Sequence, residues 1–165
     1  MIMCFESWLC ESASNPNFKR WFGASKVVDR HGQPLAVYHG SRDDFEYFEG
    51  DAHYFTDDYF NADGYAGGEN VYDVYLRMER PLIVECSGRK WDDLDTPYGS
   101  TTQGVVGNVD RKKYDGVIFR NVKDSWIDDV EYQDPGTVYV VFDATQIKSV
   151  ENGGNWDTRN KNIYE

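Results

Sequence analysis

A histidine and a glycine stand together at the end of a short apolar run, where a polar ligand could be held. The run begins at Pro34, and His39, Gly40 and Ser41 follow it directly. Proline is tolerated at the start of a strand because it has no N–H to donate, and glycine lets another group approach the backbone closely. The segment therefore predicts a strand that ends in a binding site. A lone histidine making an ordinary hydrogen bond would, however, show the same pattern.

Two tyrosines are further candidates for contact with a ligand. Tyr54 stands in His53-Tyr54-Phe55-Thr56, and Tyr65 falls on a predicted helix over Asp57–Ala66 that Thr56 would cap. Aromatic rings provide large buried areas and surfaces on which a ligand can stack. Ordinary core packing is the competing interpretation of the same two rings.

The elements that must position these residues are short, and most are strands. Asn15 and Pro16 predict the start of a helix that ends at Gly23. The turn at 30–33 predicts a hairpin between 25–29 and 34–39. Residues 96–110 are rich in Gly, Thr and Ser and are interpreted as loop, and 121–136 as a polar connection. Alternation and turn signals predict the remaining strands at Val71–Met78, Pro81–Glu85, Val117–Arg120, Thr137–Phe142 and Gln146–Val150. The sum is a strand-rich α+β domain with two or three short helices.

Length and charge bound the class of protein. At 165 residues the chain is predicted to be a single domain, with its core over 15–150 and an Asn- and Gly-rich tail over 151–165. The net charge is −12, with 17 basic and 29 acidic residues, which argues against a broad nucleic-acid interface. An acidic nucleic-acid mimic is the weakest of the alternatives, because it would depend on this charge alone.

Three cysteines and three histidines show no metal-ligand spacing. Cys4, Cys10 and Cys86 are an odd number and widely separated, which is typical of a reduced protein. The acidic cluster at 91–95 lacks the pattern of a calcium loop. No signal peptide and no long apolar window are present, so we expect a cytoplasmic protein with no metal and no membrane contact.

The order of these fragments resembles the ADP-ribosyltransferases of the diphtheria-toxin and poly(ADP-ribose) polymerase class. The resemblance is closest to the ADP-ribosyltransferase domains of phage and mobile-element polyvalent proteins. Five fragments carry it, at Trp21–Gly23, Pro34–Gly40, Tyr54–Thr56, Tyr114–Ile118 and Val141–Ser149. The fold that this resemblance implies is a split β-sheet core with short helices.

The resemblance also implies an NAD site, residue by residue. His39 would hydrogen-bond the adenosine ribose, and Gly40 would hold the nicotinamide carboxamide through its backbone, with Ser41 along the same wall. Tyr54 and Tyr65 would enclose the nicotinamide ring. Ala62 stands where the family often has serine, which removes one hydroxyl from this wall.

Val138 is the main departure from the family pattern. The catalytic residues implied are His39, Tyr54 and the residue at 138, where the family has a glutamate that steadies the charge formed as nicotinamide leaves. Losing one such electrostatic contact commonly costs on the order of 10²–10³ in rate. Four carboxylates of the preceding segment are candidates to replace it, namely Asp128, Asp129, Glu131 and Asp134.

These features favour an NAD-dependent mono-ADP-ribosyltransferase, encoded by a phage or mobile element, that modifies a host macromolecule. A protein acceptor is expected rather than a nucleic acid. Trp126, in the connection 121–136, is the candidate anchor for that acceptor, because tryptophans often dominate interface energies. The alternative is an inactive module that binds NAD or ADP-ribose, and so sequesters a nucleotide signal or binds a host defence protein.

Overall fold

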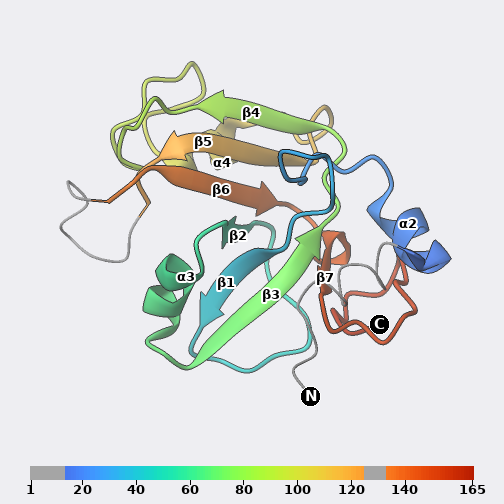
Figure 1. Cartoon of the computed structure of the whole chain (residues 1–165). Helices are drawn as coiled ribbons and strands as arrows, with labels where there is room; N and C mark the ends of the chain where they lie inside the picture. The colour runs from blue at the N-terminus through green and yellow to red at the C-terminus, as the bar shows by residue number, and fades with distance from the viewer. Residues whose placement is uncertain (1–13, 125–132) are drawn as a thin grey trace.

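A computed structural model describes residues 14–124 and 133–165, and a seven-stranded mixed sheet organises them (Figure 1). The strand order is β4-β5-β6-β2-β1-β3-β7. The strands are β1 Val37–Ser41, β2 His53–Thr56, β3 Asn70–Leu76, β4 Pro81–Glu85, β5 Gly116–Val122, β6 Gly136–Val141 and β7 Ile147–Ser149. The helices are α2 Pro16–Phe22, α3 Tyr59–Ala66 and α4 Thr102–Asn108, with a 3₁₀ turn, η2, at Ala144–Gln146.

The pairing between β1 and β2 is the shortest between neighbouring strands of the sheet. These strands share one registered pair, Tyr38↔Thr56. By contrast, β1 pairs with β3 from Val37 to Ser41, and β2 pairs with β6 over its whole length. In Figure 1, β4, β5 and β6 form the upper half of the view and β1, β2 and β3 the lower half. The predicted α+β fold with a split sheet and short helices is confirmed.

Two apolar clusters pack against the sheet. Val105 and Val106 of α4 pack with Val117 and Phe119 of β5 in one of them. The second cluster includes residues of β1, β3 and β7, and also Ile118 of β5. Because successive residues of a strand point to opposite faces, the two clusters cover opposite faces of β5.

Local sequence signals explain two of the three helices. Asn15 caps α2, and Gly23 ends it with positive φ, as predicted. The cap of α3 is Asp58, whose side chain accepts from the N–H groups of Phe60 and Asn61, so the prediction of Thr56 as the cap is wrong. The hydroxyl of Thr56 instead accepts from the N–H of Asp58, one step before the helix.

The interpretation of 96–110 as loop is also wrong, because α4 lies within it. Thr101 caps this helix by accepting from the N–H of Gly104. Helix propensity does not predict this helix, because two of its seven residues are glycines and each costs about 1 kcal/mol in a helix interior. Burial of Val105 and Val106 against β5 supplies the stability that propensity does not.

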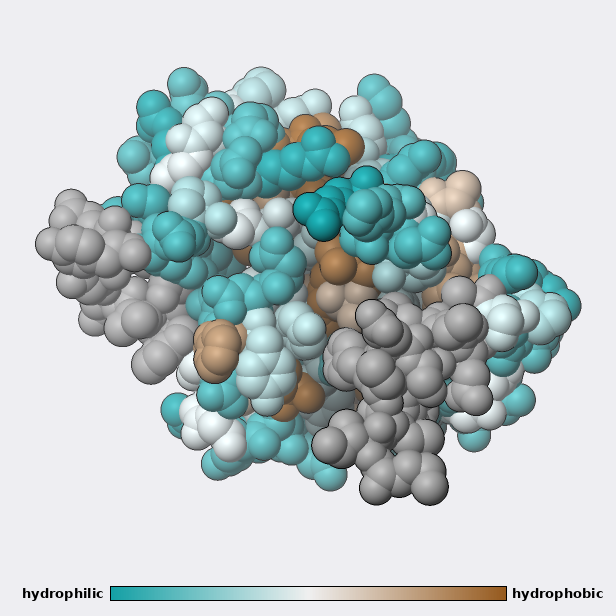
Figure 2. All heavy atoms as spheres, viewed as in Figure 1, coloured by the Kyte–Doolittle hydropathy of each residue, from teal (hydrophilic) through white to brown (hydrophobic). Residues whose placement is uncertain are grey.

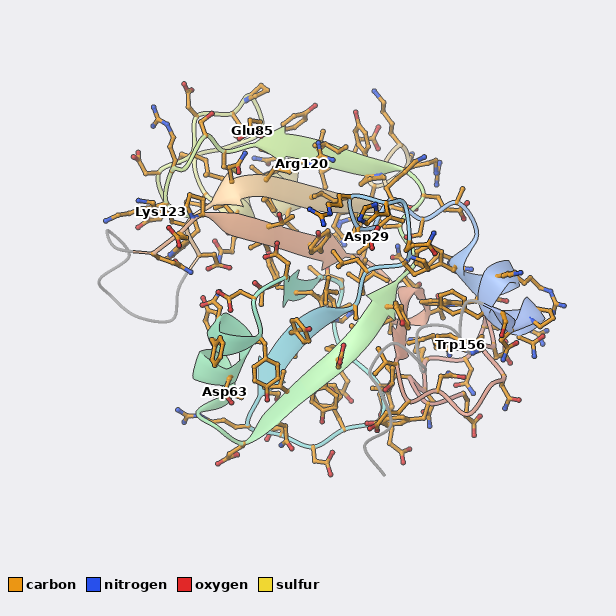
Figure 3. All side chains as sticks on the ribbon, viewed as in Figure 1. Asp29, Asp63, Glu85, Arg120, Lys123 and Trp156 are labelled. Carbon is orange, nitrogen blue, oxygen red and sulfur yellow. The ribbon has the colours of Figure 1, made fainter. Side chains whose placement is uncertain are left out.

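The C-terminal segment is held by a buried lysine. Lys148 of β7 is fully buried, and its amino group donates to the backbone carbonyls of Asn160, Asn162 and Glu165. Trp156 packs against α2, on the side of the molecule away from α3 (Figure 3). The Asn- and Gly-rich sequence is therefore ordered where it docks on β7 and α2.

Backbone contact fixes α3 on β1. A Cβ atom placed on Gly40 would lie 1.8 Å from the carbonyl oxygen of Ala62 and 2.8 Å from the amide nitrogen of Ala66. Backbone atoms cannot move aside as the end of a flexible side chain can. The position of α3 therefore requires a residue without a side chain at position 40.

We predict that Gly40→Ala destabilises the protein by about 3 kcal/mol, the upper end for an overpacked site, because α3 must shift to admit the methyl group. Urea denaturation measures this free energy of unfolding. Gly107→Ala is the matched control, since a Cβ there meets nothing within 4 Å and α4 gains helix propensity. Equal stability of the Gly40→Ala variant and the wild type would contradict the close packing of α3.

A half-buried carboxyl group on β3 makes stability depend on pH. One oxygen of Asp73 is buried with no hydrogen-bond donor among the described residues. Burial, with the nearby charge of Glu151, raises the pKa of Asp73 to about 6. The folded state therefore binds more protons than the unfolded state between about pH 4 and 6, so this group lowers stability as pH rises through that window.

We expect Asp73→Asn to stabilise the protein by about 1 kcal/mol at pH 7.5 and to have almost no effect at about pH 3, because the carboxyl group is then protonated in both states. Urea denaturation of both proteins at the two pH values measures the difference. Asp95→Asn, at an exposed carboxyl group, is the control. A gain of the same size at both pH values would exclude the charge as its cause.

Candidate functional site

A cleft of about 300 Å³ opens at the junction of β1 and β2. The two strands line it with residues 38–40 and 54–56, and α3 lines it with Asn61, Ala62 and Tyr65. Thr102 and Gln103 of α4 and the side chain of Asp124 complete the lining. The volume suits one end of a dinucleotide, at the lower limit of typical ligand sites.

His39 is partly buried and held in one tautomer. Its Nδ1 lies 2.7 Å from the backbone carbonyl oxygen of Tyr54. A carbonyl can only accept, so Nδ1 carries the hydrogen and Nε2 presents a lone pair. The ring packs edge-on against Phe48, with centroids 5.0 Å apart. Burial lowers the pKa of His39, although the bond to the carbonyl opposes the shift, so the ring is neutral at pH 7.

Gly40 and Ala62 meet in the cleft, and Ser41 lies outside its lining. Gly40 lines the cleft, and the backbone of α3 at Ala62 fills the space that a side chain of Gly40 would take. Ser41 ends β1, and its hydroxyl accepts from the N–H of Asp43. The structure therefore brings Gly40 and Ala62 to the site and engages the Ser41 hydroxyl in a turn.

Tyr54 and Tyr65 both line the cleft, one from β2 and one from α3. Burial raises the pKa of both phenols, and the nearby Asp124 raises it further at Tyr65. Both side chains are therefore neutral hydroxyls at physiological pH. Tyr65 remains 47% exposed, so its ring is accessible to a ligand.

Asp124 is a site residue that the sequence did not single out. It follows the end of β5, and its Oδ1 accepts from the hydroxyl of Tyr65 at 3.0 Å. Its backbone carbonyl accepts from the side-chain amides of Asn61, at 2.6 Å, and Gln133, at 2.8 Å. Burial raises the pKa of Asp124, and the bond from Tyr65 opposes this. A polar residue at a strand end was the available signal.

Val138 does not line the cleft. It lies on β6, paired with Thr56 and Phe119, and is 3% exposed within the apolar cluster of α4 and β5. Asp134 is exposed and also lies outside the lining. The remaining candidates from this segment, Trp126, Asp128, Asp129 and Glu131, lie outside the described residues.

Polar side chains dominate the described surface around these elements, and hydrophobic residues reach it only in small areas of the face shown in Figure 2. Over residues 14–124 and 133–165, no group of three or more His, Cys, Asp or Glu side chains is placed to hold a metal ion. Burial raises the pKa of the Cys86 thiol to about 11, so it is no reactive thiolate. None of the helices in the described part of the chain has the length and apolar content needed to cross a membrane.

Comparison with known proteins agrees with this geometry. The family model described as ADP-ribosyltransferase in polyvalent proteins matches residues 29–156, which include every described residue that lines the cleft. No curated protein and no solved structure matches the chain. Because the match covers well over half of the sequence, the chain belongs to the polyvalent-protein family of ADP-ribosyltransferases, enzymes that use NAD as substrate.

Proposed function

We propose that this protein is a mono-ADP-ribosyltransferase, encoded by a phage or mobile element, that transfers one ADP-ribose from NAD to a host protein. Nicotinamide would be released in the same step. The observation that carries the proposal is the assembly, in one cleft, of Gly40, Tyr54 and Tyr65 beside a histidine of fixed tautomer. Sequence order alone did not require these residues to meet.

Each of these groups suits one part of NAD. The lone pair on Nε2 of His39 can accept from a ribose hydroxyl, because Nδ1 is already committed to Tyr54. The exposed backbone of Gly40 can pair with the carboxamide, which needs one donor and one acceptor. The rings of Tyr54 and Tyr65 can contact the cationic nicotinamide ring, which favours electron-rich faces.

A protein acceptor is supported by charge. The chain carries a net charge of −12, so a phosphate backbone would be repelled and a basic protein surface attracted. Trp126 stays a candidate anchor for that acceptor. It follows Asp124, which lines the cleft, by two residues in the sequence.

The second candidate function is an NAD-binding module without catalysis. Val138 favours it, because an apolar residue stands where the family has its glutamate. Both functions require the same binding cleft, and they differ in whether nicotinamide is released. Incubation with NAD, followed by assay of free nicotinamide, separates them.

We predict that NAD raises the melting temperature through this cleft. A ligand at 100 times its Kd adds about 2.7 kcal/mol to the free energy of unfolding, which for a chain of this size corresponds to a shift of roughly 5–10 °C. Tyr65→Ala and His39→Ala should each remove most of the shift, since each deletes a group that contacts the ligand.

Tyr47→Ala is the matched control for Tyr65→Ala, because the two side chains are 48% and 47% exposed and Tyr47 lies outside the cleft lining. The control variant should keep the full shift. A wild-type protein whose melting temperature is unchanged by NAD, ADP-ribose and nicotinamide would show that the cleft binds none of them.

We also predict that modification stops at one ADP-ribose per acceptor site. Chain growth needs a group that activates a ribose hydroxyl, in addition to one that stabilises the leaving of nicotinamide. The described lining has a single carboxyl group, Asp124, and Val138 supplies none. Mass spectrometry of peptides from a modified acceptor should show one ADP-ribose on each modified residue. Branched or linear polymer on a single residue would contradict the assignment.

A further inference from the structure

The carboxyl group of Asp124 is placed where it could act on a ligand in the cleft. Asp124 is one of the residues that line the cleft, and one oxygen of its carboxyl group, Oδ1, accepts from the hydroxyl of Tyr65, another lining residue, at 3.0 Å. Within residues 14–124 and 133–165, no donor is bonded to the second oxygen, Oδ2. A carboxylate oxygen can face a positively charged group of a ligand.

The backbone of Asp124 is held from two directions. Its carbonyl oxygen accepts from Asn61 of α3 at 2.6 Å and from Gln133, before β6, at 2.8 Å. Lys123, its neighbour in sequence, stands at the end of β5 on the same side of the molecule as Asp63 of α3 (Figure 3). These contacts fix the carboxyl group against the helix that carries Tyr65, as a preorganised charge requires.

We propose that the Asp124 carboxylate stabilises the positive charge that develops on the ribose as nicotinamide leaves. This inference rests on the proposed function and assigns it a catalytic residue. The carboxyl group comes from the end of β5 and reaches the cleft beside Tyr65, so it does not depend on β6.

The step is a substitution at the anomeric carbon of the nicotinamide ribose. The carbon–nitrogen bond breaks with both electrons going to nicotinamide, which leaves as a neutral molecule. The ribose carbon takes up the positive charge until a lone pair of the acceptor, or of water, forms the new bond. The acceptor then loses one proton to solvent, so no oxidant, reductant or metal is needed.

Burial gives the carboxylate its effect. A charge in a partly desolvated cleft interacts with a developing cation more strongly than it would in water. Burial also raises the pKa of Asp124, whereas the hydrogen bond from Tyr65 lowers it and so favours the charged form. Tyr65 thus has a second role, as a positioning residue that keeps Asp124 ionised.

The experiment compares Asp124→Asn with Asp134→Asn, the same substitution at an exposed carboxyl group ten residues away that does not line the cleft. For both variants and the wild type, nicotinamide release from NAD and the melting shift with NAD are measured. Asp124→Asn should lower nicotinamide release by roughly 10²–10³ and keep a measurable melting shift. Asp134→Asn should match the wild type in both assays.

Tyr65→Phe supplies a second readout that a purely structural role of Asp124 would not move. Without the phenol hydroxyl the carboxylate loses a donor, so the acidic limb of the pH–rate profile should move up by about 0.5–1 pH unit. This variant keeps the aromatic ring. The melting temperature without ligand shows whether Asp124→Asn folds. If it does not, Tyr65→Phe still tests the role of the carboxylate.

Three results would overturn the inference, and they are distinguishable. Release by Asp124→Asn within twofold of the wild type removes Asp124 from catalysis and leaves the proposed function intact. An acidic limb of the pH–rate profile that is unchanged in Tyr65→Phe would show that Tyr65 does not control the ionisation of Asp124. A wild-type protein that binds NAD and releases no nicotinamide overturns the transferase itself, and supports the binding module in its place.

Discussion

Contact between the backbone of α3 and Gly40 determines the geometry of the site. The helix approaches β1 so closely that no side chain fits between them, with the carbonyl of Ala62 against the glycine. This approach places Asn61, Ala62 and Tyr65 beside the strand end. Gly40 also lines the cleft, so the residue that admits the helix lies at the candidate site.

A second constraint acts at the junction of the two halves of the sheet. Because β1 and β2 share only the pair Tyr38↔Thr56, the strands can separate beyond it and leave room for a cleft. His39 spans this junction by donating from Nδ1 to Tyr54, which joins β1 to β2 where the ladder does not. Its tautomer is thus a consequence of the narrow junction, and the acceptor it presents to the cleft follows from the same bond.

The sequence predicted the elements whose signals are local. The cap at Asn15, the glycine at 23 and the strand at Pro81–Glu85 follow from residue preferences that act over a few positions. The helix α4 did not, because its stability comes from burial of Val105 and Val106 against a distant strand. The cap of α3 was misplaced by two residues, since Thr56, Asp57 and Asp58 all suit that position and only the backbone conformation selects Asp58.

Some residues of the candidate site were predicted from the sequence, and others were found only in the structure. Fragments that resemble the family predicted His39, Gly40, Tyr54, Ala62 and Tyr65, and the fold brings these to one cleft. Asp124, Thr102 and Gln103 were missed because they reach it only through the tertiary arrangement of β5 and α4. Prediction of a replacement carboxylate focused on the residues nearest in sequence to Val138. The residue that lines the cleft instead follows the neighbouring strand in the sheet, and strand order is a property that periodicity does not reveal.

We propose that the junction between β1 and β2 is a nicotinamide site, and a crystal structure of the protein with a slowly reacting NAD analogue can locate the ligand. The nicotinamide ring should contact both Tyr54 and Tyr65, its carboxamide should pair with the backbone of Gly40, and a ribose hydroxyl should donate to Nε2 of His39. Density for the analogue at any other place, with this cleft empty, would contradict it.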